Sequence, residues 1–343
     1  MIPHLSPAFA PLAALLTTAI LTPVVRRFGL RSGRLDVPNE RSSHVRPTPR
    51  TGGWAIAAGI VAGVAIGRAF ADRGITVAVV AALLLAALAI IDERTELPRM
   101  LRLVLQIGVA VLTPIVAGIA VHRLDLPFAS IPLGWAAIPL SVFWIVGVTN
   151  GYNFMDGLNG ISSVEAIVCG ATMGTLALRS GDAAAAVLAL SLGAAAFGFL
   201  PWNAGGSIFM GDTGSATFGF LFAALTLRLT QNGTSIVAAA LPLLPFLLDS
   251  GVTLLRRALR GERFFSTPHR SHFYQHLQQQ GWPHLAVSAV YGALAVCSGV
   301  VALQWEDLTP GGQLLALAAL LALHAAIFSV IEIRWKRLVG AVA

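Results

Sequence analysis

Long apolar segments are the feature of this 343-residue sequence that most restricts its fold. Hydrophobic residues make up 56% of the chain and charged residues only 11%, whereas a soluble domain carries about 25% charged residues. The apolar residues gather in runs of about 17 to 25, the length of helix that crosses a bilayer. The sequence therefore predicts an all-α, polytopic integral membrane protein and excludes a soluble fold.

Eleven of these runs are predicted to be transmembrane helices. No basic residue precedes the apolar part of the first run, and Arg26 and Arg27 follow it, so we expect an anchor rather than a cleaved signal. The predicted spans are residues 8–25, 53–70, 75–91, 101–120, 132–150, 162–178, 184–201, 214–227, 235–254, 286–304 and 312–331.

The arginines predict the orientation, because basic residues gather in the cytoplasmic loops of membrane proteins. Every second connection between the predicted spans lies on the same side of the membrane. The connections on one side, together with the carboxyl-terminal segment, contain most of the arginines and the only lysine, Lys336. We therefore expect the amino terminus outside and the carboxyl terminus in the cytoplasm. Residues 1–343 are expected to form a single transmembrane domain, with its active site in the cytoplasmic loops. Those loops are 26–52, 92–100, 151–161, 202–213 and 255–285.

Acidic residues in two of these loops could hold a cation. Asp92 and Glu93 are adjacent at the predicted end of the third span, where they could bind a divalent cation or share a proton. Asp212 lies beside Gly211 at the predicted start of the eighth helix, where a carboxylate can ligate Mg²⁺ and free backbone N–H groups favour phosphate. The structural alternatives are a helix-end charge cluster for the pair and a helix cap for Asp212.

The segment TNGYNFMDGLNGIS, residues 149–162, presents polar side chains at a regular interval. Asn150, Asn153, Asp156 and Asn159 recur every third residue, which places them near one face of a helical turn. Amides and a carboxylate presented together can read a nucleobase edge or a diphosphate–metal unit. An ordinary Asn/Gly loop is the structural alternative.

Two further loops combine histidine with arginine. In STPHRSHFYQH, residues 266–276, the cluster of His269, Arg270 and His272 suits a phosphate or a sugar. Zinc is not expected, because there is no nearby cysteine and no HExxH pattern. In residues 36–54, His44 and Arg50 flank a Pro-Thr-Pro turn that precedes a glycine pair. Positive-inside bias explains Arg50 without any chemistry, but it does not explain His44 or the turn.

Five of these motifs resemble, in the same order, those of the polyprenyl-phosphate N-acetylhexosamine-1-phosphate transferases. They are PTPRTGG, the acidic pair, NFMDGLNG, FMGDTGS and HRSHFYQ. The resemblance covers residues from about 36 to 276, and the family includes phospho-N-acetylmuramoyl-pentapeptide transferase. It implies transfer of a sugar 1-phosphate from a UDP-sugar to a polyprenyl phosphate such as undecaprenyl phosphate, with release of UMP. It also implies Mg²⁺, or alternatively Mn²⁺, as cofactor. A location in the bacterial inner membrane and a role in starting a cell-surface glycan, such as the O-antigen of lipopolysaccharide, follow from the same resemblance.

The resemblance also assigns roles to individual residues. The catalytic residues are Asp92, Glu93 and Asp212, and Asp212 is the metal ligand. The nucleotide-binding residues are Asn150, Asn153 and Asp156. The residues that meet the phosphates or the sugar are His44, Arg50, Arg102, His269, Arg270 and His272. The family usually has two aspartates where this chain has Asp92 and Glu93, which makes the role of Glu93 less secure than that of Asp212.

The sequence leaves several alternatives open. The HRSHFYQ form is similar to the branches that make glycan lipids, so a UDP-N-acetylhexosamine is the expected donor and the muramoyl-pentapeptide donor is the alternative. The transfer could be one direct displacement, or it could pass through an intermediate in which a carboxylate is phosphorylated, and the residues are compatible with both. Polyprenyl phosphate and membrane lipid are the other expected partners, a homodimer is left open, and no nucleic-acid partner is expected.

A membrane transporter or lipid flippase is the rival from another functional class. Asp249 lies within the ninth predicted span, where an ionisable group should face the bundle interior or a wet cavity. Such a residue is compatible with transport. Transporters, however, place polar groups and broken helices near the membrane midplane, whereas here the polar groups gather at one predicted surface.

Overall fold

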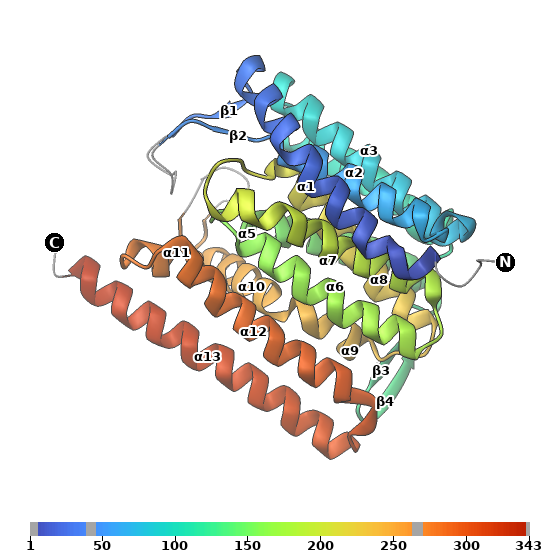
Figure 1. Ribbon diagram of the computed structural model, residues 1–343. Coiled ribbons are helices and arrows are strands. Elements are labelled where there is room, and N and C mark those ends of the chain that lie inside the picture. The colour runs from blue at the N-terminus through green and yellow to red at the C-terminus, as the bar shows by residue number, and fades with distance from the viewer. Residues whose placement is uncertain (1–5, 39–45, 263–269, 341–343) are drawn as a thin grey trace.

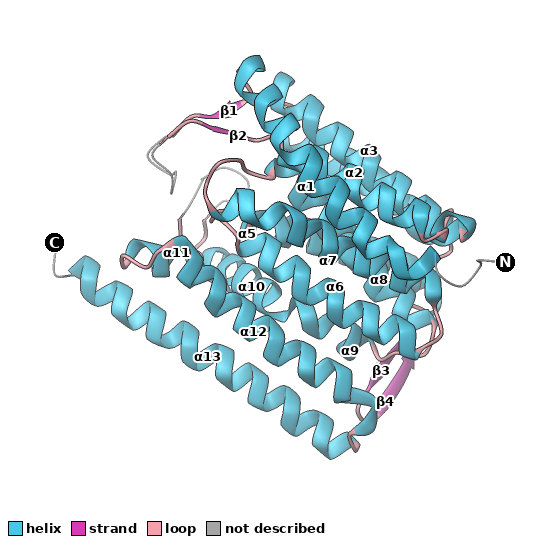
Figure 2. Cartoon of the chain, in the orientation of Figure 1, coloured by secondary structure: helices cyan, strands magenta, loops and turns pink. Residues whose placement is uncertain are grey.

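The computed structural model describes residues 6–38, 46–262 and 270–340. Within these ranges the chain forms a bundle of roughly parallel helices, and its first and last described residues lie at opposite ends of the bundle (Figure 1). Two short antiparallel hairpins, β1–β2 and β3–β4, also lie at opposite ends (Figure 2). The elements are α1 (Ser6–Ser32), β1 (Leu35–Asp36), β2 (Thr48–Pro49), α2 (Gly52–Ile66), α3 (Arg73–Thr95), α4 (Arg99–Ile115), β3 (Arg123–Leu126), β4 (Ala129–Pro132), α5 (Ala137–Met155), α6 (Ile161–Arg179), α7 (Ala183–Ala204), α8 (Gly211–Gln231), α9 (Ile236–Ala240), α10 (Leu244–Leu259), α11 (Phe273–Gln279), α12 (His284–Gln304) and α13 (Pro310–Gly340).

The prediction of an all-α, polytopic membrane protein is confirmed. Every predicted span overlaps a helix, and the described residues contain eight helical segments long and apolar enough to cross a membrane, together with the shorter α2. The number of eleven crossings and the orientation stay predictions. The ninth predicted span is not one regular helix, because Pro242 and Pro245 lack the N–H donors that a continuous helix needs. A short 3₁₀ turn at Leu241–Leu243 joins α9 to α10 instead.

The helix α8 forms the centre of the bundle and is buried along most of its length. It packs mainly against α5 and α3, and α2, α6, α7 and α9 also contact it. Gly219 permits the close contact with α5, since a Cβ there would lie 2.8 Å from the Cα of Thr149. The outermost helices, α1 and α13, expose many apolar side chains, as helices in contact with lipid do.

The start of α8 is held by backbone contacts with the segment that leads into α2. Phe209 N–H donates to the carbonyl of Pro49 (2.8 Å), and the N–H groups of Gly52 and Gly53 donate to the carbonyls of Phe209 (3.0 Å) and Met210 (2.8 Å). A Cβ on Gly53 would lie 2.3 Å from the backbone nitrogen of Gly214. The glycine pair is therefore required for α2 and α8 to approach each other.

The far end of α8 is held by one arginine. Arg228 donates from Nε to Asp182 (2.6 Å) and from Nη2 to Asp72 (2.9 Å), and these two aspartates cap α7 and α3. Burial alone would raise the pKa of Asp182, but hydrogen bonds from Arg228, Ala185 and Asn232 outweigh it and lower the pKa below its usual value. The ionised pair thus stabilises the fold above the usual carboxyl pKa, and its contribution is lost as the pH falls through the lowered pKa.

We expect Gly53→Ala to destabilise the protein, because the added Cβ cannot fit against Gly214 without separating α2 from α8. Overpacking of this kind costs about 1–3 kcal/mol. The measurement is the thermal unfolding midpoint of the purified protein in detergent. Gly108→Ala is the matched control, since a Cβ on that helical glycine meets nothing within 4 Å. Equal midpoints for both variants would contradict the close α2–α8 contact.

We expect Arg228→Gln to lower the free energy of unfolding by about 2 kcal/mol at neutral pH, because two charge-assisted hydrogen bonds are lost. The difference in the free energy of unfolding between this variant and the wild-type protein should become smaller below about pH 4, where carboxylates take up protons. Thermal unfolding at several pH values measures both effects. The exposed Arg73, at the start of α3, provides the control Arg73→Gln. A pH-independent difference would show that the Asp182 charge is not involved.

Candidate active site

A cleft of about 720 Å³ opens among α3, α4, α5, α8, α10 and the start of α11. Part of its wall is polar and part is apolar, so it can accept a ligand with a charged head and a hydrocarbon tail. The polar wall is formed by Asp92, Arg99, Arg102, Gln106, Thr149, Asn150, Asn153, Asp212, Arg257, His272 and Gln275. The apolar wall is formed by Leu85, Leu88, Ala89, Leu103, Phe154, Ala216 and Leu254.

Asp212 and Asn153 meet where α8 begins. Asp212 is exposed in the first turn of α8, and the amide of Asn153 donates to its Oδ1 (3.1 Å) and to the hydroxyl of Ser215 (2.8 Å). Because Gly219 brings α5 close to α8, Asn153 reaches Asp212 from the end of α5. Two motifs that lie about 60 residues apart in the chain thus form one polar surface.

Asp92 also belongs to the polar wall and lies in the last turn of α3. Its Oδ2 accepts from Nη1 of Arg102 (2.8 Å) and its Oδ1 accepts from the N–H of Leu97 (2.9 Å). Arg102 belongs to α4 and remains 43% exposed, so its guanidinium is held by Asp92 and is also accessible from the cleft. Asn150 of α5 completes this side and donates to the side chain of Gln106 (2.9 Å).

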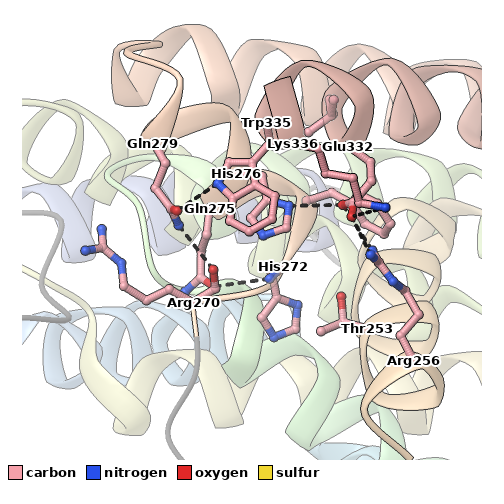
Figure 3. Close-up of polar contacts among 12 residues, drawn as sticks. Thr253, Arg256, Arg270, His272, Gln275, His276, Gln279, Glu332, Trp335 and Lys336 are labelled. Atoms are coloured by element: carbon pink, nitrogen blue, oxygen red, sulfur yellow. Dashed lines mark hydrogen bonds and ion pairs between the residues drawn. The ribbon is translucent and has the colours of Figure 1, made fainter. Parts of the chain in front are cut away.

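His272 reaches the cleft from the residue that precedes α11. The middle of this short helix is held by α13, as Figure 3 shows, where Glu332 pairs with His276 (3.3 Å). Glu332 also binds Arg256 of α10 (2.5 Å) and Lys336 of its own helix (3.6 Å). The ring of His276 also stacks on that of Trp335 at 3.9 Å. Within the predicted loop 255–285, the helix α11 is thus anchored to the bundle.

Several predicted site residues lie outside the cleft lining. Arg50 is paired with Asp36 (2.6 Å), and Arg270 donates to Gln278 (3.3 Å). Glu93 is exposed beside the start of α8, where its Oε1 lies 3.5 Å from the position that a Cβ on Gly211 would occupy. Asp156 follows the end of α5. His44 and His269 lie outside the described residues.

The carboxylates are suited to Mg²⁺ in combination with a phosphate ligand. Among the described residues, no three His, Cys, Asp or Glu side chains form a metal cluster. Mg²⁺ does not need such a cluster, because it commonly binds one or two carboxylates and completes its shell with water and phosphate oxygens. Burial raises the pKa of Asp156 to about 8, and the negative charge of Asp212 contributes to the increase. A bound cation would relieve this repulsion, so the donor set fits the metal.

Five polar residues of the cleft were not singled out in the sequence as site residues: Arg99, Gln106, Thr149, Arg257 and Gln275. Gln106 carries a signal that could have found it, since it is a polar side chain within an apolar span. Arg257 is 3% exposed and paired with Glu262 (2.8 Å), but in the sequence it is one of many arginines that positive-inside bias explains. Gln275 lies in the recognised HRSHFYQ motif, and nothing in the sequence distinguishes it from its polar neighbours.

Comparison with known proteins identifies the family. Residues 75–230 match the family described as "Glycosyl transferase family 4". A protein of Bacillus subtilis described as a probable undecaprenyl-phosphate N-acetylglucosaminyl 1-phosphate transferase is 32% identical over 287 residues, covering 82% of this chain and 80% of the relative. The decaprenyl-phosphate N-acetylglucosaminephosphotransferase of Mycobacterium tuberculosis is 32% identical over 315 residues, covering 82% and 78%. The phospho-N-acetylmuramoyl-pentapeptide-transferase of Staphylococcus aureus is 29% identical over 212 residues, covering 58% and 63%.

The matches to the first two relatives extend well beyond the matched family segment and include most of the transmembrane bundle. Residues from four of the five motifs line one cleft, and with this extent of similarity the chain belongs to glycosyl transferase family 4.

Proposed function

We propose that the protein transfers N-acetylglucosamine 1-phosphate from its UDP derivative to a polyprenyl phosphate. An oxygen of the lipid phosphate forms a bond to the phosphorus that carries the sugar. The bond from that phosphorus to the oxygen bridging it to the uridine phosphate breaks, and UMP leaves with that oxygen. The products are a polyprenyl-diphosphate sugar and UMP.

The observation that carries this proposal is the division of the cleft into a charged wall and an apolar wall. Asp92, Arg102, Asn153 and Asp212 line one part, and leucines from α3, α4 and α10 line another. A polyprenyl phosphate has the same division, with an anionic head and a tail too apolar to leave the bilayer. The site can therefore bring a soluble nucleotide sugar to a lipid that remains in the membrane.

On the donor side we assign Asp212 to Mg²⁺, or Mn²⁺ in its place. The metal would neutralise charge on the diphosphate of the nucleotide sugar. Asn153 donates to Asp212 and so fixes the direction of that carboxylate. Asn150 and Asp156, on the same segment as Asn153, are proposed to contact the nucleotide.

On the acceptor side we assign Arg102 to the lipid phosphate. Both oxygens of Asp92 are hydrogen-bonded, and Asp92 holds the Arg102 guanidinium where a phosphate can bind it. Glu93, exposed beside the start of α8, is the member of the acidic pair proposed to accept a proton from the acceptor. We assign His272 to the phosphates or the sugar. The family resemblance gives the same role to Arg50, Arg270, His44 and His269.

The extent of similarity supports N-acetylglucosamine as the sugar. The two relatives named for N-acetylglucosamine phosphate transfer match 82% of this chain, whereas the muramoyl-pentapeptide relative matches 58%. We propose the cytoplasmic face of a bacterial inner membrane as the location, because UDP-sugars are soluble and the acceptor is a membrane lipid. The product would start a cell-surface glycan, of which O-antigen is one class.

A donor screen tests the proposed reaction. Purified protein with Mg²⁺ and undecaprenyl phosphate should release UMP from UDP-N-acetylglucosamine, or from a 6-deoxy relative such as UDP-N-acetylfucosamine or UDP-N-acetylquinovosamine. Omitting undecaprenyl phosphate should abolish the release. UMP release only from the UDP-muramoyl-pentapeptide donor would move the protein to that branch. No release with any of these donors would favour a transporter.

Asp212→Asn should lower turnover by about 100-fold or more, because it removes the charge assigned to the metal. The thermal unfolding midpoint should hardly change, since Asp212 is exposed and contributes little to packing. UMP release and thermal unfolding measure the two effects. Asp307→Asn is the control, because Asp307 is an exposed aspartate between α12 and α13, outside the cleft. Wild-type turnover in Asp212→Asn would refute the metal assignment.

A further inference from the structure

Asp249 is a fully buried carboxylate within the segment Ile236–Leu259, one of the segments long and apolar enough to cross the membrane. An ionisable side chain at membrane depth costs about 2.5–3.5 kcal/mol on insertion scales, unless other groups compensate it. Asp249 does not line the cleft described above. Its burial is therefore explained by the groups that bind it rather than by direct contact with a substrate.

Five donors surround this carboxylate. The backbone N–H groups of Phe273 and Tyr274, in the first turn of α11, donate to Oδ1 and Oδ2 at 3.1 Å each. Thr253 donates to Oδ1 (3.3 Å), and the hydroxyl of Tyr291 donates to Oδ2. The fifth contact joins Oδ1 to Nδ1 of His272 at 3.0 Å. Asp249 thus fixes the start of α11 and the ring of His272 at the same time.

The contact with His272 determines where that ring carries a hydrogen. An ionised carboxylate can only accept hydrogen bonds, so Nδ1 of His272 must be the donor and must be protonated. Nε2 is then the ring nitrogen on the side away from this contact, and His272 lines the cleft together with Arg257 and Gln275. A carboxylate behind an imidazole also stabilises the doubly protonated ring, whose Nε2–H can donate to a phosphate oxygen.

The frame around this pair is rigid. Tyr274 donates from its hydroxyl to the carbonyl of Phe154 (3.0 Å), which ties the first turn of α11 to the end of α5. At the other end of α11, Trp335 donates to Gln279 (3.0 Å). At the first residue of the helix, Phe273 stacks on Phe328 at 4.2 Å. The helix α11 contacts α10, α12 and α13. Since the helix cannot easily shift, the hydrogen bond to Asp249 sets the orientation of His272.

We propose that Asp249 is a positioning residue for the transfer reaction, which acts by holding the Nδ1–H of His272 so that Nε2 faces the phosphates in the cleft. This inference rests on the function proposed above. It assigns an essential role to a membrane-embedded carboxylate that does not touch the substrate. It also explains why a charged residue is retained at this depth.

The first test measures the protonation of the ring directly. Nitrogen-15 NMR of histidine-labelled protein in detergent distinguishes a protonated from an unprotonated Nδ1, and the resonance of His272 is identified by its absence in His272→Gln. We expect a protonated Nδ1 in the wild-type protein. An unprotonated Nδ1 would overturn the proposal. This measurement needs no substrate, so it decides the geometry even if the wild-type protein releases no UMP, a result that would contradict the proposed function separately.

The second test is a double-mutant cycle on UMP release. Asp249→Asn should lower kcat by about 30-fold, with a much smaller change in KM for the UDP-sugar, because an interaction made in the transition state is weakened. In the His272→Gln background the same substitution should change kcat by less than about threefold, because Asp249 acts through His272. Effects that multiply would show that Asp249 only supports the fold.

A matched control separates positioning from stability. Ser141 is also fully buried and its hydroxyl accepts a backbone N–H, that of Val121 (2.9 Å), outside the cleft. Ser141→Ala should lower the thermal unfolding midpoint while kcat stays within about twofold of wild type, since it breaks two neutral hydrogen bonds, the one from Val121 and the one to the carbonyl of Ala137 (2.7 Å). If Asp249→Asn does not fold, the ring measurement on the wild-type protein decides the proposal alone.

Discussion

Backbone hydrogen bonds between residues 49–53 and residues 209–210 are the contact on which the cleft depends. They fix the first turn of α8, and with it Asp212, without using any flexible side chain. The same helix receives Asn153 from α5 and is fixed at its far end by Arg228. The position of the proposed metal ligand is therefore set by the central helix of the bundle rather than by the loops around it.

The bilayer explains why the polar chemistry lies at one end of the bundle. Backbone and side-chain polar groups within the hydrocarbon region must find partners inside the protein. Asp249 satisfies this condition through five donors, and each of those donors belongs to α10, α12 or the segment that starts α11. One buried charge thereby joins the membrane-embedded part of the protein to a side chain at the reaction cleft.

Much of this arrangement could be predicted from the sequence, because apolar length and arginine distribution determine helices and loops strongly. Asp92, Arg102, Asn150, Asn153, Asp212 and His272 do line a common cleft. The partners of these residues could not be predicted, since they depend on helix packing. The contact of Gly53 with Gly214 and the pairing of Asp249 with His272 join residues that are far apart in the chain. The break between α9 and α10 could have been read from Pro242 and Pro245.

The central proposal is that Asp212, oriented by Asn153, holds a metal-bound diphosphate against a lipid phosphate bound by Arg102, which Asp92 holds in place. The most direct test is an experimental density map of the protein with Mn²⁺ and UDP-N-acetylglucosamine, with the metal located by its anomalous signal. The account predicts Mn²⁺ bound by the carboxylate of Asp212, with the diphosphate in the cleft between α3 and α8. A metal or a diphosphate bound away from Asp212 would contradict it.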